Sequence, residues 1–79
     1  MAIKCEYDRE VDAIYLVLSD KPYSYSKELD DTRHVDYASD HSPIGIELLC
    51  VSDGVIVDDL PYQEQVARVL SDYKIKVFA

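Results

Sequence analysis

The sequence has few residues that interrupt regular structure, with only two glycines and three prolines in 79 residues. This scarcity excludes long flexible linkers and low-complexity segments. No apolar run approaches the ~20 residues that a membrane-spanning helix needs, and no hydrophobic leader of signal-peptide length follows Met1. We therefore expect a cytoplasmic protein that has no contact with a membrane.

Residues that mark chemical sites are also sparse. The two cysteines, Cys5 and Cys50, lie in apolar surroundings without C-x-x-C spacing, so we expect buried, free thiols in a reducing compartment. The chain contains no Gly-rich phosphate loop, no nucleophile elbow and no Cys/His spacing typical of a metal site. We therefore expect neither a cofactor nor a bound metal.

Positive charge is in deficit. Eight Lys and Arg face sixteen Asp and Glu, which leaves a formal net charge of −8. This charge repels phosphate backbones and so disfavours direct binding of nucleic acid. It favours encounters with a basic protein, although acidic surfaces also simply keep small proteins soluble.

The chain does contain enough apolar residues for a core, with 48% hydrophobic residues and seven tyrosines. We expect a single domain over residues 1–79, because this length leaves no room for a second core. So small a domain buries little surface by itself, and oligomerisation would bury more.

The longest apolar run, residues 13–18, predicts a central strand over residues 13–19 that is covered on both faces. Ile14, Leu16 and Leu18 would point to one side. The alternating stretch at residues 2–7 predicts a first, half-buried strand. The charged residues 8–12 would connect the two strands as a hairpin.

Two further strands are predicted over residues 27–38 and 44–51, the former with a bulge near residues 30–31. If Asp40-His41 forms a two-residue type I′ turn between them, the register follows. The facing pairs would then be Tyr37 with Ile44, Val35 with Ile46, and His34 with Glu47.

The spacing changes near the C-terminal end of the sequence. Apolar residues at 62, 66, 69, 70 and 73 predict an amphipathic helix over residues 60–73, with an acidic cap at Asp58 or Asp59 and Pro61 in its first turn. Residues 55–57 read as a short strand stub. Residues 74–78 read as an edge strand of the sheet, whose lysines suit exposure.

These elements predict an α+β fold, in which residues 1–51 form a four-stranded antiparallel meander. The helix would cover one face of this sheet. The second face would carry apolar side chains that need a cover, and a symmetric copy of the chain is the simplest one. We therefore expect a homodimer, whose interface consists of Tyr15, Val17, Leu49 and Val51.

His34, Asp36 and Glu47 are the candidates for chemistry. His34 and Asp36 share one face of a strand, and Glu47 lies across from His34 in the expected register. A His–carboxylate pair can act as a general base or as part of a metal site. The alternative is a cross-strand ion pair on a solvated face. Gly45, beside Glu47, lets another group approach the sheet closely.

Four motifs in order resemble a bacterial domain-of-unknown-function family, number 2283: Tyr7-Asp8-x-Glu10-x-Asp12-Ala13-x-Tyr15-Leu16, then Glu28-Leu29, Val35-Asp36-Tyr37 and Gly45-Ile46-Glu47-Leu48-Leu49. The resemblance covers residues 3–51 and implies a small β-rich protein without an assigned reaction. Some members resemble antitoxin-type partners of small basic proteins. The first motif lacks the glycine and the distal glutamate of an EF-hand, so we expect Asp8 and Asp12 to bind backbone amides.

We therefore expect a non-catalytic protein-interaction module, an antitoxin-like binder of a small basic protein. A small hydrolase or metal-dependent enzyme that uses His34, Asp36 and Glu47 is the alternative. A structural homodimer without a dedicated partner is the third reading.

Overall fold

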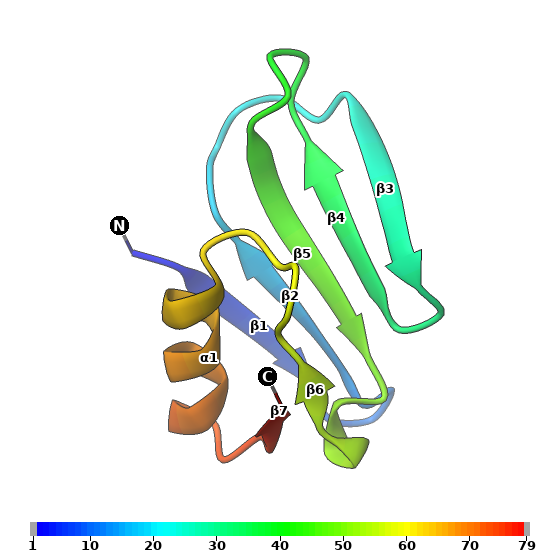
Figure 1. Ribbon diagram of the computed structural model, residues 1–79, viewed down its shortest axis with the longest axis vertical. Coiled ribbons are helices and arrows are strands. Elements are labelled where there is room, and N and C mark those ends of the chain that lie inside the picture. The colour runs from blue at the N-terminus through cyan, green and yellow to red at the C-terminus, as the bar shows by residue number, and fades with distance from the viewer. Residues whose placement is uncertain (1, 79) are drawn as a thin grey trace.

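A computed structural model describes residues 2–78. It is an α+β fold with a five-stranded antiparallel sheet and one C-terminal helix (Figure 1). The sheet strands are β1 (Lys4–Asp8), β2 (Ala13–Val17), β3 (Tyr25–Asp30), β4 (Arg33–Tyr37) and β5 (Pro43–Leu49). The C-terminal segment contains a short 3-10 helix η1 (Val51–Asp53), β6 (Val55–Ile56), α1 (Gln63–Asp72) and β7 (Val77–Phe78).

The predicted four-stranded meander is wrong in both strand number and strand order. The order is β1-β2-β5-β4-β3, so the chain leaves β2, passes the ends of β5 and β4, and returns strand by strand (Figure 1). The different burial of β3 and β5 explains this strand order. β5 has buried residues in most of its length and needs a neighbour on each side, whereas five of the six residues of β3 are exposed, as suits an edge.

The predicted strand 27–38 is two strands joined by a tight turn. Asp30 Oδ1 accepts hydrogen bonds from the backbone N and the hydroxyl of Thr32, both at 3.1 Å. Aspartate side chains stabilise turns in this way. The irregularity that we expected near residues 30–31 lies just before this turn, between Glu28 and Asp30.

The β4–β5 hairpin has the predicted register in its body but not at its turn. His34 faces Glu47 and Val35 faces Ile46, but Tyr37 pairs with Pro43 and not with Ile44. The turn is not of type I′, because only His41 of the two central residues has a positive φ, at 69°. The backbone N of His41 donates to the Ala38 carbonyl, and its imidazole meets the Tyr25 hydroxyl at 2.8 Å.

The helix begins at Gln63, later than the expected residue 60, and no acidic side chain caps it. Tyr62 precedes it with a φ of 54° and no side-chain cap. The final strand is also placed differently from the prediction, since it is not an edge of the main sheet. β7 pairs in parallel with β6 in a separate two-stranded sheet, with Val55 opposite Val77.

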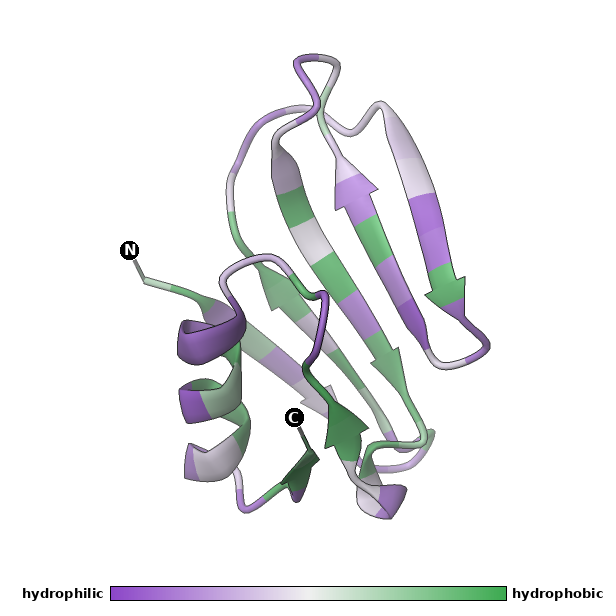
Figure 2. Cartoon of the chain, viewed as in Figure 1, coloured by the Kyte–Doolittle hydropathy of each residue, from purple (hydrophilic) through white to green (hydrophobic). Residues whose placement is uncertain are grey.

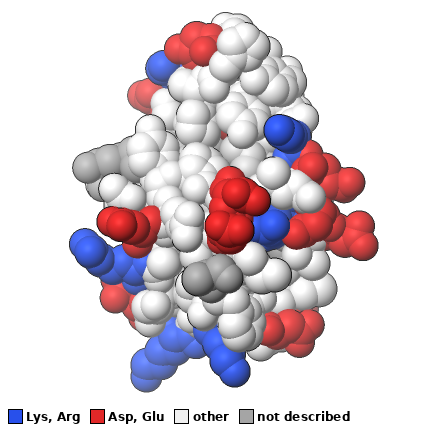
Figure 3. Space-filling model, in the orientation of Figure 1, with Lys and Arg blue, Asp and Glu red and all other residues white. Residues whose placement is uncertain are grey.

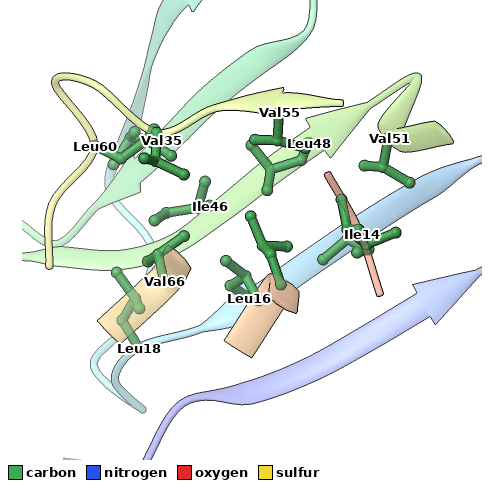
Figure 4. Packing of buried hydrophobic residues seen from close by; sticks show 13 residues of the cluster. Ile14, Leu16, Leu18, Val35, Ile46, Leu48, Val51, Val55, Leu60 and Val66 are labelled. Carbon is green, nitrogen blue, oxygen red and sulfur yellow. The ribbon is translucent and has the colours of Figure 1, made fainter. Parts of the chain in front are cut away.

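The C-terminal segment covers one face of the sheet and forms the core with it. α1 turns its apolar side toward the sheet and its hydrophilic side outward (Figure 2). Val66 and Leu70 of α1 are fully buried, together with Leu16 and Ile46 of the sheet (Figure 4). Each such side chain contributes roughly 1.5–3 kcal/mol to the stability of the fold. As predicted, Ile14, Leu16 and Leu18 lie under this cover. The strand that was expected to be central is not, because β5 takes the middle position in the sheet and β2 lies beside it.

Two residues, Arg33 of β4 and Asp12 of the β1–β2 turn, form hydrogen bonds with the C-terminal segment. The Arg33 guanidinium donates to the carbonyls of Ile56 (2.9 Å) and Asp58 (2.7 Å), and its Nε donates to Asp30 (2.9 Å). Asp12, with a φ of 57°, accepts from the backbone N (3.0 Å) and the hydroxyl (2.6 Å) of Ser52. Asp8 accepts from the backbone N of Glu10 and so shapes the first hairpin turn.

Candidate interaction face

No element of residues 2–78 covers the side of the sheet opposite α1, and we call this side the open face. Side chains alternate between the two sides of each strand, so the pairing register defines which residues project here. The face includes five carboxylates and one lysine among the residues of the five strands: Lys4, Glu6, Asp8, Glu28, Asp36 and Glu47. Its remaining surface comes from Ala13, Tyr15, Val17, Ser26, His34, Gly45 and Leu49. The face is acidic.

A row of polar side chains crosses all five strands of the open face. Successive register pairs place Glu6 beside Tyr15, Tyr15 beside Glu47, Glu47 beside His34, and His34 beside Glu28. Side chains directly opposite each other on neighbouring strands lie close enough to interact. The sheet thus aligns three glutamates, one tyrosine and one histidine across its full width.

His34 lies between two of these carboxylates. Its Nε2 is 3.0 Å from Glu28 Oε1 and, since a carboxylate only accepts, Nε2 is the donor in this hydrogen bond. Its Nδ1 lies 3.3 Å from Glu47 Oε1 without the alignment of a hydrogen bond, and this contact is an ion pair only when the imidazole is protonated. Glu47 is half exposed and keeps its carboxylate available to a partner.

Tyr15 leans across β5 toward Asp36. Its hydroxyl donates to Asp36 Oδ2 at 2.7 Å, and Ser26 donates to Asp36 Oδ1 at 2.6 Å. The ring passes over Gly45, where a Cβ atom would lie 1.9 Å from the Tyr15 hydroxyl oxygen. Burial and the hydrogen bond to the Asp36 carboxylate raise the pKa of Tyr15 to about 12. Tyr15 is therefore a fixed, neutral donor at physiological pH.

The open face is hollowed over β1 and β2, on the side of Tyr15 away from Asp36. The hollow has a volume of about 420 Å³ and is lined mainly by Glu6, Asp8, Ala13, Tyr15 and Glu47. Ala13 and the tyrosine ring supply its apolar surface, and three carboxylates surround it. We call it the acidic hollow. Its lining thus combines an apolar surface with acidic groups at its border.

His34 and Glu47 lie together in the structure, but Asp36 forms its hydrogen bonds with other residues. Both Asp36 oxygens are engaged by Tyr15 and Ser26, so Asp36 does not orient the imidazole. No hydroxyl or thiol contacts His34 in residues 2–78 that could serve as a nucleophile activated by it. Within the same described range, no group of three or more His, Cys, Asp or Glu residues is arranged to hold a metal ion.

Three of the four residues expected at a homodimer interface lie on the open face, and the fourth does not. Tyr15, Val17 and Leu49 are partly buried there. Val51 is fully buried in the core, because the chain turns at Cys50 into η1 and carries Val51 under the C-terminal segment. Carboxylates stand among the three remaining residues, so the face is less apolar than the sequence suggested.

The two cysteines are free, but only one is sheltered. Cys5 points to the core side of β1, and burial raises the pKa of its thiol. Cys50 is exposed, contrary to expectation, because its left-handed conformation (φ 53°) ends the alternation of β5.

Sequence reasoning missed the glutamates that complete the row, Glu6 and Glu28. Each lies on an edge strand, and neither belongs to an apolar run that would draw attention to it. The signal was available for Glu6, because the alternation of residues 2–7 places it on the polar side of β1. For Glu28, the correct strand order was needed first.

Comparison with known families gives one match. The profile of the family described as "Protein of unknown function (DUF2283)" matches residues 4–52, which span β1 to β5 and the beginning of η1. No curated protein and no solved structure matches the chain. Within residues 2–78, the one helix is too short and too polar to cross a membrane.

Proposed function

Because this chain belongs to DUF2283, a family of proteins of unknown function, we propose its function from the open face: it is a non-catalytic module that binds a basic segment of another protein. The observation that carries the proposal is the polar row that crosses five strands beside the acidic hollow. An antitoxin that sequesters a small basic protein would use such a face.

Charge and shape support the same kind of partner. Carboxylates outnumber the single lysine of the face, Lys4, which is itself 3.5 Å from Glu6. Opposite charges on a partner would speed its approach and fix its register on the sheet. The partly buried Val17 and Leu49 add apolar contact that a purely ionic surface lacks. Binding would therefore combine charge with apolar burial.

The acidic hollow supplies a position for one arginine or lysine of the partner. The methylene stem would lie on Ala13 and the Tyr15 ring, and the charged end would reach Glu6, Asp8 or Glu47. Arginine fits better than lysine, because its planar guanidinium pairs with carboxylates in a fork and stacks on aromatic rings. The proposal thus names an arginine as the anchoring residue of the partner.

A second copy of the chain fits this face less well than a basic partner does. In a twofold interface the same patch meets itself, so the carboxylates of both copies would lie close together. Like charges that meet across an interface are repulsive. Light scattering after size-exclusion chromatography separates the two readings. A stable dimer that is lost when Val17 and Leu49 are changed to serine would support the second copy.

The proposal is tested with a short probe peptide that carries two arginines, in a titration followed by NMR. We expect Glu6→Gln/Glu47→Gln to weaken binding of the peptide at least about tenfold. The matched control is Glu64→Gln/Asp72→Asn, which removes the same two charges from exposed positions on α1 and should weaken binding less than about twofold. Salt above ~0.3 M should abolish binding in every variant that binds.

Equal losses in both double variants would contradict the proposal, since they would show attraction to net charge alone. A peptide with citrulline in place of arginine separates shape from charge and should not bind. For the natural partner, co-expression with the basic product of a neighbouring reading frame gives the corresponding test. Retention of that product by the Glu6→Gln/Glu47→Gln variant would also overturn the proposal.

A further inference from the structure

A second hollow, of opposite charge, lies at the end of the molecule where α1 leads into β7. Its volume is about 360 Å³, and none of the described residues that line it is Asp or Glu. Its polar and aromatic lining consists of Tyr7, Arg9, Ser52, Tyr73, Lys74 and Lys76. Figure 3 shows Lys and Arg atoms gathered at this end of the molecule. We call it the basic hollow. It concentrates three of the eight positive charges of a chain whose net charge is −8.

Within residues 2–78, the cations of the basic hollow form no ion pair with a carboxylate. Lys4, Lys21 and Arg33 each form an ion pair with a carboxylate. Among residues 2–78, no carboxylate lies within ion-pair distance of Arg9, Lys74 or Lys76. Three cationic residues from two separate parts of the chain therefore line one hollow. The Lys76 ammonium also lies 5.5 Å from the centroid of the Phe78 ring. A helix C-terminus attracts lysines, which accounts for Lys74 but not for Arg9 in the β1–β2 turn.

Aromatic rings hold the arginine in place. The Arg9 guanidinium lies over the Tyr7 ring, 4.6 Å from its centroid. Tyr73 meets Tyr7 edge-on, with centroids 6.2 Å apart. The Arg9 guanidinium donates no hydrogen bond within residues 2–78, and the N–H groups of a guanidinium pair with oxyanions through two parallel hydrogen bonds. The contact with the Tyr7 ring limits the positions that the Arg9 side chain takes before a ligand binds.

We propose that the basic hollow binds the phosphate group of a small molecule, a function separate from that of the open face. The oxygens of the phosphate would be held by Arg9, Lys74 and Lys76. Tyr73, which is 40% exposed, would offer its ring to the organic part of the ligand. The volume lies in the range of small-molecule sites, ~300–1,000 Å³. The carboxylate of Asp12 lies near but faces Ser52, which donates to both of its oxygens.

A small ligand fits better than a nucleic acid. A polyanion that extended beyond the hollow would meet the acidic remainder of the surface, and that charge repels a phosphate backbone. A single phosphate group meets only the local cations. The same chemistry is offered by inorganic phosphate and by a phosphate ester, and the experiment below separates these two ligands.

The test is a titration of the protein with inorganic phosphate and with adenosine monophosphate at constant ionic strength, followed by NMR. We expect saturable binding, with shifts confined to residues 7–9, 52 and 73–76. Binding of the nucleotide at least about threefold more tightly than phosphate would identify an ester as the ligand class. Equal or weaker binding of the nucleotide would identify free phosphate as the ligand.

Lys74→Asn/Lys76→Gln should weaken binding at least about tenfold. Asparagine suits position 74, because Lys74 has a φ of 61° and asparagine tolerates this conformation. The matched control is Lys27→Gln/Arg68→Gln. It removes two other cations that form no ion pair within residues 2–78, both exposed and outside the lining of the hollow, and it should change binding less than about twofold. Equal weakening in both double variants, or no saturable binding to the unmodified protein, would overturn the proposal.

Discussion

The ring of Tyr15 occupies the space that a side chain at position 45 would fill. The absence of a side chain at Gly45 therefore allows Tyr15 to reach Asp36. Gly45 is not required by its backbone conformation, because its φ is not positive. We therefore predict that Gly45→Ala destabilises the protein by about 1–3 kcal/mol through overpacking, measured by urea unfolding.

The partner variant for this test is Tyr15→Ala. In the Tyr15→Ala background, Gly45→Ala should be neutral or slightly stabilising, since the clash is gone and alanine suits a strand better than glycine. The coupling energy of the cycle should then exceed ~1 kcal/mol. An additive cycle would show that the tyrosine does not depend on the glycine.

The stability of the protein should depend on Tyr15 at high pH. The pKa of Tyr15 is about 12 in the folded protein and 10 in the unfolded chain, so the unfolded state loses its proton first. The stabilising contribution is complete below pH 10 and is lost as the pH rises toward 12. Tyr15→Phe cannot lose a proton and serves as the reference. The difference in unfolding free energy between wild type and Tyr15→Phe should shrink over this window, and a constant difference would contradict the assignment.

Arg33 should stabilise the protein by fastening the C-terminal segment to β4. Its side chain is only 12% exposed and donates to two backbone carbonyls and to Asp30. Arg33→Ala leaves these acceptors without their donor, and we expect a loss of about 2–3 kcal/mol in unfolding free energy. Lys21→Ala removes another Lys/Arg–Asp pair, but both partners are about half exposed, and it should have a far smaller effect. Similar losses in the two variants would contradict the anchoring role.

Asp12 should fasten the β1–β2 hairpin to η1. Asp12→Ala removes both hydrogen bonds to Ser52 and places alanine at a φ of 57°, so we expect a cost of about 2–3 kcal/mol. Asp12→Asn tolerates this backbone conformation and keeps one acceptor oxygen, and it should cost less than about 1 kcal/mol. Thermal unfolding of the two variants checks the order. A larger loss for asparagine than for alanine would contradict it.

Local patterns were predictable from the sequence. The alternation of Ile14, Leu16 and Leu18 placed the buried side of β2 correctly, because a period of two depends only on neighbouring residues. The pairing of His34 with Glu47 also followed, since a hairpin brings together residues that are near in sequence. The sequence therefore predicted that His34 and Glu47, two residues of the polar row, lie opposite each other.

Turns and strand order were not predictable in the same way. Among the residues that the structure describes, six other than glycine have a positive φ, including Asp12, His41 and Tyr62. A chain with only two glycines uses such residues where a glycine would have marked the turn, which explains the errors at residues 40–41 and at the start of α1. The strand order depends on contacts between β2 and β5, some thirty residues apart, which no local pattern records. The acidic hollow depends on that order and was missed for the same reason.

The match to the family ends at residue 52, but the core does not. Val55, Val57, Leu60, Val66, Leu70 and Ile75 all lie beyond it and all belong to the buried cluster. In an obligate dimer, a second subunit covers the apolar face of a sheet. Residues 53–78 do the same here, but they belong to the same chain, so one cover is always present for each sheet. A relative that lacked this segment would expose Leu16, Ile46 and Leu48 and would need another polypeptide to cover them. In this chain the attached segment supplies that cover, and the opposite side of the sheet stays uncovered within residues 2–78.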